Sequence, residues 1–187
     1  MGGERSPPVD RESALAARAR RGDREAFATL VAVYDRGLRA LAFRLLGDRD
    51  EMEDVLQEAY IKAFRGLPRF RGQADVGTWL YRLTYNASLD ELKRSRRRRE
   101  VPLIEASDWP SEGVDPTVEV DARGVVAAVL ANLPVDQRAA VLLVDGEGFS
   151  YGDAAEILGV SVAALGSRLN RARSVLRAVL ERAGADE

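Results

Sequence analysis

The sequence of 187 residues contains no cysteine and no histidine. Without cysteine, the chain can form no disulfide and perform no thiol chemistry. Without histidine, it lacks the commonest metal ligand and the usual general base. Its apolar runs are all shorter than the roughly 20 residues that cross a bilayer, and residues 1–10 contain no signal-peptide core. We therefore expect a cytoplasmic protein without cofactor, metal site or membrane insertion.

The remaining composition is that of a globular protein, with 46% apolar and 31% charged residues. A net charge of −2 conceals an uneven distribution along the chain. Residues 1–99 hold 21 basic and 15 acidic side chains, whereas residues 100–121 hold seven acidic and no basic ones. Residues 122–187 are nearly balanced, with seven basic and eight acidic side chains. This distribution predicts two small domains with different partners, joined by an acidic linker.

The last third of the chain contains the pattern of a helix-turn-helix. Ser150 and Asp153 have capping-box spacing at the start of a short apolar helix. Gly159 suits the turn, and Ser161 can cap a second helix, in which apolar residues recur every three to four positions. The other face of that helix is polar and basic, with Ser167, Arg168, Asn170, Arg171 and Arg173. The pattern favours a helix that enters a DNA major groove, the alternative being a helical hairpin with a solvated arginine face.

The first two helices of the N-terminal half are predicted to end at Gly22 and Gly47, since glycine often follows a helix C-terminus. Asp23 can cap the second of them. A third helix is expected to begin at Asp50, with Glu53 at capping-box spacing.

On the third helix, Asp54, Gln57 and Glu58 share one exposed face by their spacing. The helix also has a cluster of acids, made up of Asp50, Glu51, Glu53, Asp54 and Glu58. Three interpretations of these acids stay open: a magnesium site, favourable charge near a helix N-terminus, or an acidic docking face for a protein partner. The first is the weakest, because the sequence offers no second acidic cluster to help the chelation.

Residues 67–78 contain two glycines and a proline and so predict a loop, after which Thr78 would cap a helix from Trp79 to about Arg99. This fourth helix carries Arg82 and Asn86 on one face, with Tyr81 and Tyr85 beside them. Its end, residues 93–99, has six basic residues in seven. Phosphate neutralisation combined with aromatic stacking is typical of single-strand binding, although a solvated basic helix end is the simpler alternative.

These patterns predict an all-α protein of two small helical domains. We expect a disordered tail (1–9), a helical domain (10–99), a flexible acidic linker with three prolines (100–122) and a four-helix domain with the helix-turn-helix (123–187).

Four segments carry a resemblance to a known family. In chain order they are DEMEDVLQEAYIKAFR, FRGQADVGTWLYRLTYNASLDELKR, LPVDQRAAVLL and SYGDAAEILGVSVAALGSRLNRAR. Together the chain resembles the extracytoplasmic-function (ECF) sigma factors of the bacterial sigma-70 family over about residues 22–99 and 123–181. The resemblance implies a non-enzymatic subunit that directs RNA polymerase core to specific promoters and helps to open the −10 region.

The resemblance also implies roles for individual residues. Asp54, Gln57 and Glu58 would dock on the β′ clamp of the polymerase, whose β flap would be a further contact. The −10 element would be bound by Arg71, Gly72, Gln73, Trp79, Arg82, Asn86, Lys93 and Arg97. The −35 element would be bound by Tyr151, Ser161, Ser167, Arg168, Asn170, Arg171 and Arg173. An anti-sigma factor would be the regulator.

Two positions depart from the family pattern: Gly166 stands where a lysine is usual, and Val76 where an aromatic residue is frequent.

Two other functions stay open at this point. One is a dimeric helix-turn-helix regulator with a helical sensor domain, which would not need the basic, aromatic fourth helix. The other is a metal-dependent nucleic-acid enzyme that uses the carboxylates near Asp54.

Overall fold

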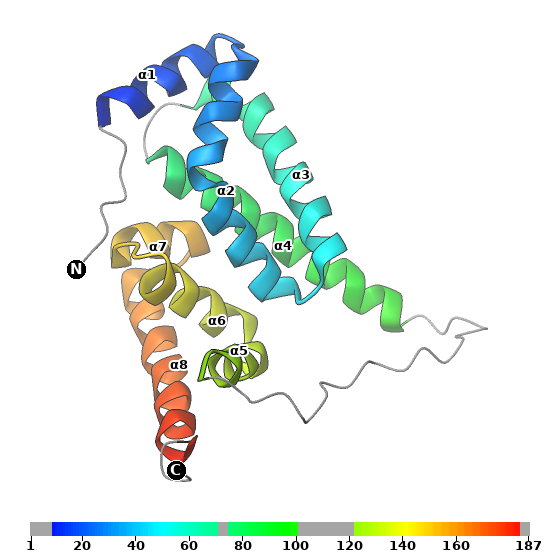
Figure 1. The fold of residues 1–187 in the computed structure, drawn as a ribbon, viewed down its shortest axis with the longest axis vertical. Helices are drawn as coiled ribbons and strands as arrows, with labels where there is room; N and C mark the ends of the chain where they lie inside the picture. Colours follow the sequence, from blue (N-terminus) through cyan, green and yellow to red (C-terminus); the bar gives the residue numbers. More distant parts are fainter. Residues whose placement is uncertain (1–8, 71–74, 101–121, 184–187) are drawn as a thin grey trace.

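A computed structural model describes residues 9–70, 75–100 and 122–183, and within these ranges the chain is helical without any strand (Figure 1). The N-terminal bundle consists of α1 (Val9–Arg20), α2 (Arg24–Leu46), α3 (Arg49–Gly66), the 3₁₀ turn η1 (Leu67–Arg69) and α4 (Val76–Glu100). The C-terminal bundle consists of α5 (Ala122–Asn132), α6 (Val135–Val141), the π-helical turn η2 (Leu142–Gly146), α7 (Tyr151–Leu158) and α8 (Val162–Ala183). The predicted all-α class is confirmed. Nearly all of the predicted tail and linker lies outside the described residues. None of the described helices is long and apolar enough to span a membrane.

The ends of α2 follow the sequence prediction. The Asp23 carboxylate accepts the Ala26 N–H at 2.9 Å, and Gly47 closes the helix in the left-handed conformation with φ of 77°. The predicted start of α3 is wrong. Asp48, not Asp50, caps this helix, because its carboxylate accepts the Glu51 N–H at 2.9 Å and so takes the capping position two residues earlier.

The predicted start of α4 is wrong as well. The helix begins at Val76, and the Asp75 carboxylate accepts the Gly77 N–H at 2.7 Å. Thr78, the predicted cap, is buried inside the first turn. The carboxylate of Asp75, three residues before Thr78, therefore caps the helix in place of the threonine hydroxyl.

The helix-turn-helix forms as predicted. Ser150 Oγ accepts the Asp153 N–H at 3.1 Å at the start of α7. Gly159 ends α7 in the left-handed conformation with φ of 65°, and Ser161 Oγ accepts the Ala164 N–H at 3.2 Å at the start of α8. The apolar stripe of α8 lies in the core through Leu165, Leu169 and Ala172. This anchoring turns the opposite face of α8 outward.

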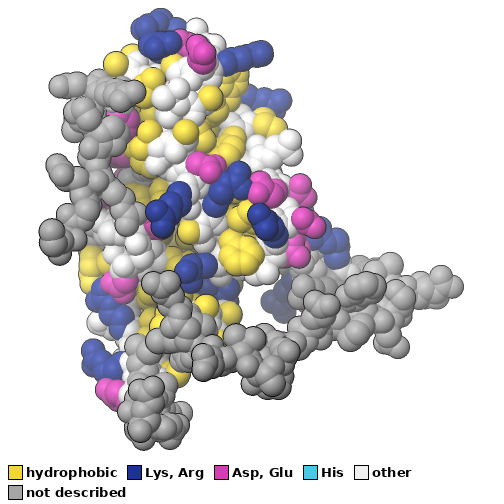
Figure 2. All heavy atoms as spheres, viewed as in Figure 1, with side chains coloured by type: hydrophobic (Ala, Val, Ile, Leu, Met, Phe, Trp, Pro, Cys, Tyr) yellow, Lys and Arg dark blue, Asp and Glu magenta, His cyan; other side chains and the backbone are white. Residues whose placement is uncertain are grey.

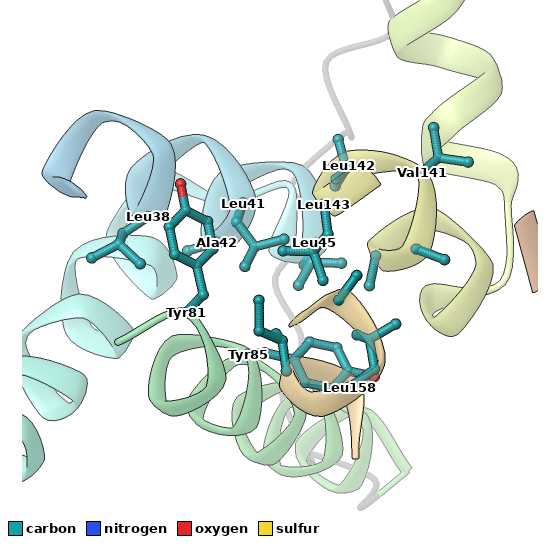
Figure 3. Packing of buried hydrophobic residues seen from close by; sticks show 14 of the residues in the cluster. Leu38, Leu41, Ala42, Leu45, Tyr81, Tyr85, Val141, Leu142, Leu143 and Leu158 are labelled. Carbon is teal, nitrogen blue, oxygen red and sulfur yellow. The ribbon is translucent and has the colours of Figure 1, made fainter. Parts of the chain in front are cut away.

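One hydrophobic cluster runs through both bundles (Figure 3). From the N-terminal bundle it includes Leu38, Leu41, Ala42 and Leu45 of α2 and Tyr81 and Tyr85 of α4; from the C-terminal bundle it includes Val141, Leu142, Leu143 and Leu158. The bundles therefore share a core instead of folding as two separate globules. Helix α4 lies directly against α7, so the first helix of the helix-turn-helix covers part of the N-terminal bundle.

Polar contacts also join the bundles. The Tyr81 hydroxyl donates to Glu147 Oε2 at 2.9 Å, and its ring meets Phe149 edge to face at 4.7 Å between centroids. The Arg138 guanidinium of α6 donates to the carbonyl oxygens of Arg44 at 2.9 Å and Leu45 at 3.3 Å, where α2 ends. A cation at a helix C-terminus is favourable, because it meets the unpaired carbonyls and the negative end of the helix dipole.

Because of this packing, Tyr81 and Tyr85 are only 3% and 4% exposed. The prediction that they stand beside the polar face of α4 as stacking partners for nucleic acid is therefore wrong. Helix α4 is covered on a second side, by the C-terminal bundle, which no pattern within the helix itself could indicate.

Candidate functional site

The predicted docking face lies on α3. Asp54 and Gln57 are exposed, Glu58 is half-buried, and the exposed Ile61 follows one turn later. These side chains line a shallow depression together with Lys62 and Arg65. Acidic side chains gather along the edge of the molecule that α3 forms (Figure 2). The structure thus brings the three predicted docking residues onto one accessible surface with an apolar centre.

Glu58 is the most constrained of the three. Its carboxylate lies 2.6 Å from Lys62 Nζ and 3.2 Å from Arg94 Nη2. Hydrogen bonds from Lys62 and then Arg94 hold the pKa of the Glu58 carboxyl below its ordinary value. Within the described ranges, no three Asp, Glu, His or Cys side chains converge as metal ligands would. The Glu58 carboxylate meets cationic side chains instead.

On α4, the predicted −10 residues Arg82 and Asn86 are exposed. Trp79 is half-buried and stacks on Phe70, with 4.8 Å between ring centroids and 29° between planes. Three further predicted residues, Arg71, Gly72 and Gln73, lie outside the described residues. The described part of this surface is therefore an open polar face beside an aromatic pair.

Part of the basic end of α4 has a structural task that sequence reasoning missed. The buried Glu91 is held between Arg94 at 2.8 Å and Arg98 at 2.6 Å. Arg94 also reaches Glu58, and Arg98 reaches Glu51 at 3.5 Å, so these two arginines tie α4 to α3. The spacing of Glu91, Arg94 and Arg98 at i, i+3 and i+7 was the available signal.

The two predicted phosphate-binding residues of this helix end lie on its surface. Lys93 is 3.5 Å from Asp90, and Arg97 is exposed. Surface ion pairs of this kind are weak, so the Lys93–Asp90 contact leaves Lys93 able to exchange partners.

On α8, the structure divides the predicted −35 residues into two groups. Ser167, Asn170 and Arg171 are exposed on the face opposite the buried leucines. Arg173 forms a two-pronged pair with Asp145, at 2.6 and 3.0 Å, and also donates to the Tyr151 hydroxyl at 3.2 Å. These bonds raise the pKa of Arg173, the Asp145 bond being the largest cause. Arg168 Nε lies 3.1 Å from Asp136.

The departure at Gly166 faces open space. A β-carbon built at this glycine meets no atom within 4 Å. The backbone at Gly166 is helical, and the residue is half-buried. A side chain can therefore be added at this position without displacing a neighbouring atom.

Comparison with known proteins places both bundles in one class. Residues 30–98 match Sigma-70 region 2, and residues 123–176 match Sigma-70, region 4. The first match covers most of α2 to α4, and the second covers α5 to most of α8. The fold and its two matched regions therefore define a sigma-70-type transcription initiation factor.

A curated relative identifies the subclass of sigma factor to which the chain belongs. The chain is 39% identical over 159 residues to the ECF RNA polymerase sigma factor SigM of Mycobacterium tuberculosis, with 85% of this chain and 79% of SigM covered. This chain belongs to the ECF RNA polymerase sigma factors. A dimeric regulator with a sensor domain is therefore not favoured.

Two solved structures have a similar fold over most of the chain. CnrH, in complex with the cytosolic domain of CnrY, superimposes with a TM-score of 0.68 at 28% identity, over 92% of this chain and 98% of CnrH. The sigma factor RpoE of Bartonella quintana, in complex with the anti-sigma factor NepR, gives a TM-score of 0.66 at 28% identity, over 83% of this chain and 96% of RpoE.

Proposed function

We propose that this chain docks on RNA polymerase core through the α3 face (Asp54, Gln57, Glu58), binds the −10 element along α4 and binds the −35 element with α8. The observation that carries the proposal is that both matched regions present an exposed polar face, on α3 and α4 in one bundle and on α8 in the other. A helix whose apolar face is anchored in the core can offer its polar face to a major groove. Arg71, Gly72 and Gln73, which lie outside the described residues, belong to the same proposal for the −10 element.

The protein acts as a specificity subunit, not as an enzyme, since the polymerase supplies the chemistry. Its place of action is the cytoplasm, where the polymerase and the promoters are. The α3 face combines exposed side chains, Asp54 and Gln57, with the half-buried and ion-paired Glu58. Such a face suits recognition of a protein surface, because complementary charges across an interface set the orientation and register of the two partners.

An anti-sigma factor is the proposed regulator. The similar sigma factor RpoE is known in complex with the anti-sigma factor NepR, and the similar protein CnrH in complex with the cytosolic domain of CnrY. A groove of about 1450 Å³ between the bundles is lined by α1 and α2 on one side and by α5 and η2 on the other. A protein segment lying in it would touch both bundles at once and could hold them in one arrangement.

Run-off transcription with purified core polymerase tests the central proposal. The chain should direct transcription from a cognate promoter that core alone does not use. Gln57→Arg should abolish this activity, because a buried unmatched cation at an interface costs several kcal/mol. The matched control is Ala28→Arg, which adds the same charge at an exposed position of α2 that does not line the depression on α3. Normal core binding by Gln57→Arg would show that α3 is not the docking face.

A further inference from the structure

Helix α1 precedes the segment that matches Sigma-70 region 2, which begins at residue 30. It packs against α2 and η1 at the end of the N-terminal bundle where α2 begins (Figure 1). Its side chains at positions i, i+3, i+4, i+7 and i+8, the spacing of one helix face, are buried or half-buried. This inner face of α1 consists of Glu12, Leu15, Ala16, Ala19 and Arg20. It therefore has a carboxylate at one end and a guanidinium at the other.

The guanidinium end contacts the aromatic pair beside the proposed −10 surface. The Arg20 guanidinium carbon lies 5.5 Å from the centroid of the Phe70 ring, within the roughly 6 Å over which a ring attracts a cation. Arg20 Nε is buried and has no hydrogen-bond partner among the described residues, so no such bond at this atom draws the guanidinium away from the ring. Since Phe70 stacks on Trp79, α1 reaches the indole through one intervening ring.

The carboxylate end acts on the first turn of α4. Glu12 accepts a hydrogen bond from the hydroxyl of Tyr34, which belongs to α2. The Tyr34 ring lies directly over Gly77, where an added β-carbon would be 2.5 Å from Tyr34 Cε1. Glu12 thus orients a ring that packs against the backbone of α4 three residues after its cap, Asp75, ends the preceding segment at the N–H of Gly77.

A second apolar cluster connects the two ends of the inner face of α1. Its buried members come from α1, α2 and η1 and are Ala19, Ala26, Leu30 and Leu67. Phe70, Val76 and Trp79 pack against it, together with Leu15 and Ala16 of α1. The start of α4 and the aromatic pair therefore rest on a support of which α1 forms one side.

We propose that α1 is a positioning element for −10 binding, in which Arg20 and Glu12 fix the place of the Trp79 indole. The inference rests on the proposed function and deepens it, because it names residues outside the matched region that position the −10 surface. The effect of α1 is confined to the first turn of α4. Asn86 lies seven residues beyond Trp79, about 10 Å at 1.5 Å per residue, along the part of α4 that packs on α2 and α3.

The first test is binding of the chain, in complex with core polymerase, to the single-stranded −10 region of the promoter used for run-off transcription. Arg20→Leu keeps apolar bulk beside Phe70 and removes the cation. Its affinity for this strand should fall by about 2- to 10-fold, the range of a cation–π contact. Arg20→Lys keeps a cation and should recover most of the loss. Binding of the full chain to −35 duplex should be unchanged, because that surface lies on α8.

The matched control is Arg21→Leu, which removes the same charge at the neighbouring exposed position. It should leave the affinity for the −10 strand within twofold of the parent value. Should Arg20→Leu fail to fold by circular dichroism, Glu12→Ala takes its place. Glu12→Gln is then the conservative variant, since its amide oxygen can still accept the Tyr34 hydroxyl.

Coupling to Trp79 distinguishes positioning from general support of the fold. Arg20→Leu combined with Trp79→Ala should cost no more −10 affinity than Trp79→Ala alone, because the indole that Arg20 positions is then absent. Arg20→Leu combined with Asn86→Ala should multiply the two separate losses. In a Trp109→Phe background, Trp79 is the remaining tryptophan, and its quenching by acrylamide should increase in Arg20→Leu but not in Arg21→Leu.

Normal −10 affinity in both Arg20→Leu and Glu12→Ala would overturn the proposal for α1. Equal losses at the −10 strand and the −35 duplex, or losses that multiply with Trp79→Ala, would overturn it too, since α1 would then support the fold as a whole. If the parent chain itself, in complex with core, does not bind the −10 strand, the proposed function is contradicted instead.

Discussion

At the scale of single residues, arginines of the same helix have different environments. Arg171 is exposed on α8, whereas Arg173, two positions on, is held by Asp145 and Tyr151 within the C-terminal bundle. An arginine whose donors are already engaged must break those bonds before it can bind a base. Base discrimination should therefore depend on Arg171, and Arg173 should chiefly hold α8 against η2 and α7.

We expect opposite outcomes from two alanine substitutions. Arg171→Ala should reduce the preference for one −35 base pair by roughly 10- to 100-fold, since a good bidentate base contact contributes about 1–3 kcal/mol of discrimination. Arg173→Ala should leave the preference unchanged and lower the stability of the fold, because Asp145 loses its partner. Binding of the full chain to single-position −35 duplex variants, with urea unfolding in parallel, measures both. Equal loss of base preference in the two variants would mean that Arg173 leaves Asp145 on binding DNA.

Among the helices, the local capping signals decided which boundaries could be predicted. Asp23, Ser150 and Ser161 stand alone at their helix starts, and each caps as expected. At the starts of α3 and α4, more than one residue could cap the helix. Asp48 and Asp75 accept the backbone N–H groups there, instead of the expected Asp50 and Thr78. Sequence spacing cannot rank such neighbours, because the choice depends on where the preceding turn leaves each side chain.

Helix α8 gives a prediction about Gly166. The glycine lies in the helix with open space beside it, so Gly166→Ala should stabilise the protein by about 0.5–1 kcal/mol through helix propensity. Gly166→Lys should in addition strengthen binding to −35 duplexes nearly uniformly across sequences. One added phosphate contact should steepen the dependence of log K on log salt by about 0.9.

The measurement is duplex binding at several salt concentrations, with Gly166→Ala as the control for helix propensity alone. If the lysine variant has the same affinity and salt slope as the alanine variant, this turn of α8 does not approach the DNA backbone.

At the scale of the molecule, sequence patterns predict each bundle but not the face that joins them. The repeats of α4 place Tyr81 and Tyr85 beside a polar face, and only the packed structure puts the C-terminal bundle over them. The same limit applies to Arg138, which reads as an ordinary helix arginine in the sequence and in the structure donates to the end of α2. Contacts between parts far apart in the chain leave no period in the sequence.

The shared core predicts how the whole chain unfolds. Because one hydrophobic cluster runs through both bundles, loss of either bundle exposes apolar surface of the other, so both should unfold in a single urea transition. Trp79 reports on the N-terminal bundle, and far-ultraviolet circular dichroism reports on all helices. In a Trp109→Phe background, which removes the other tryptophan, the two transitions should coincide.

Gly37→Ala should separate these transitions. The substitution disturbs the contact of Tyr81 with Glu147, so each bundle becomes a smaller cooperative unit whose m value is lower, since m follows the surface exposed on unfolding. Gly166→Ala should shift the midpoint while keeping the two curves together. Non-coincident curves in the parent protein would mean that the bundles unfold independently, and that their apolar contact contributes too little free energy to couple them.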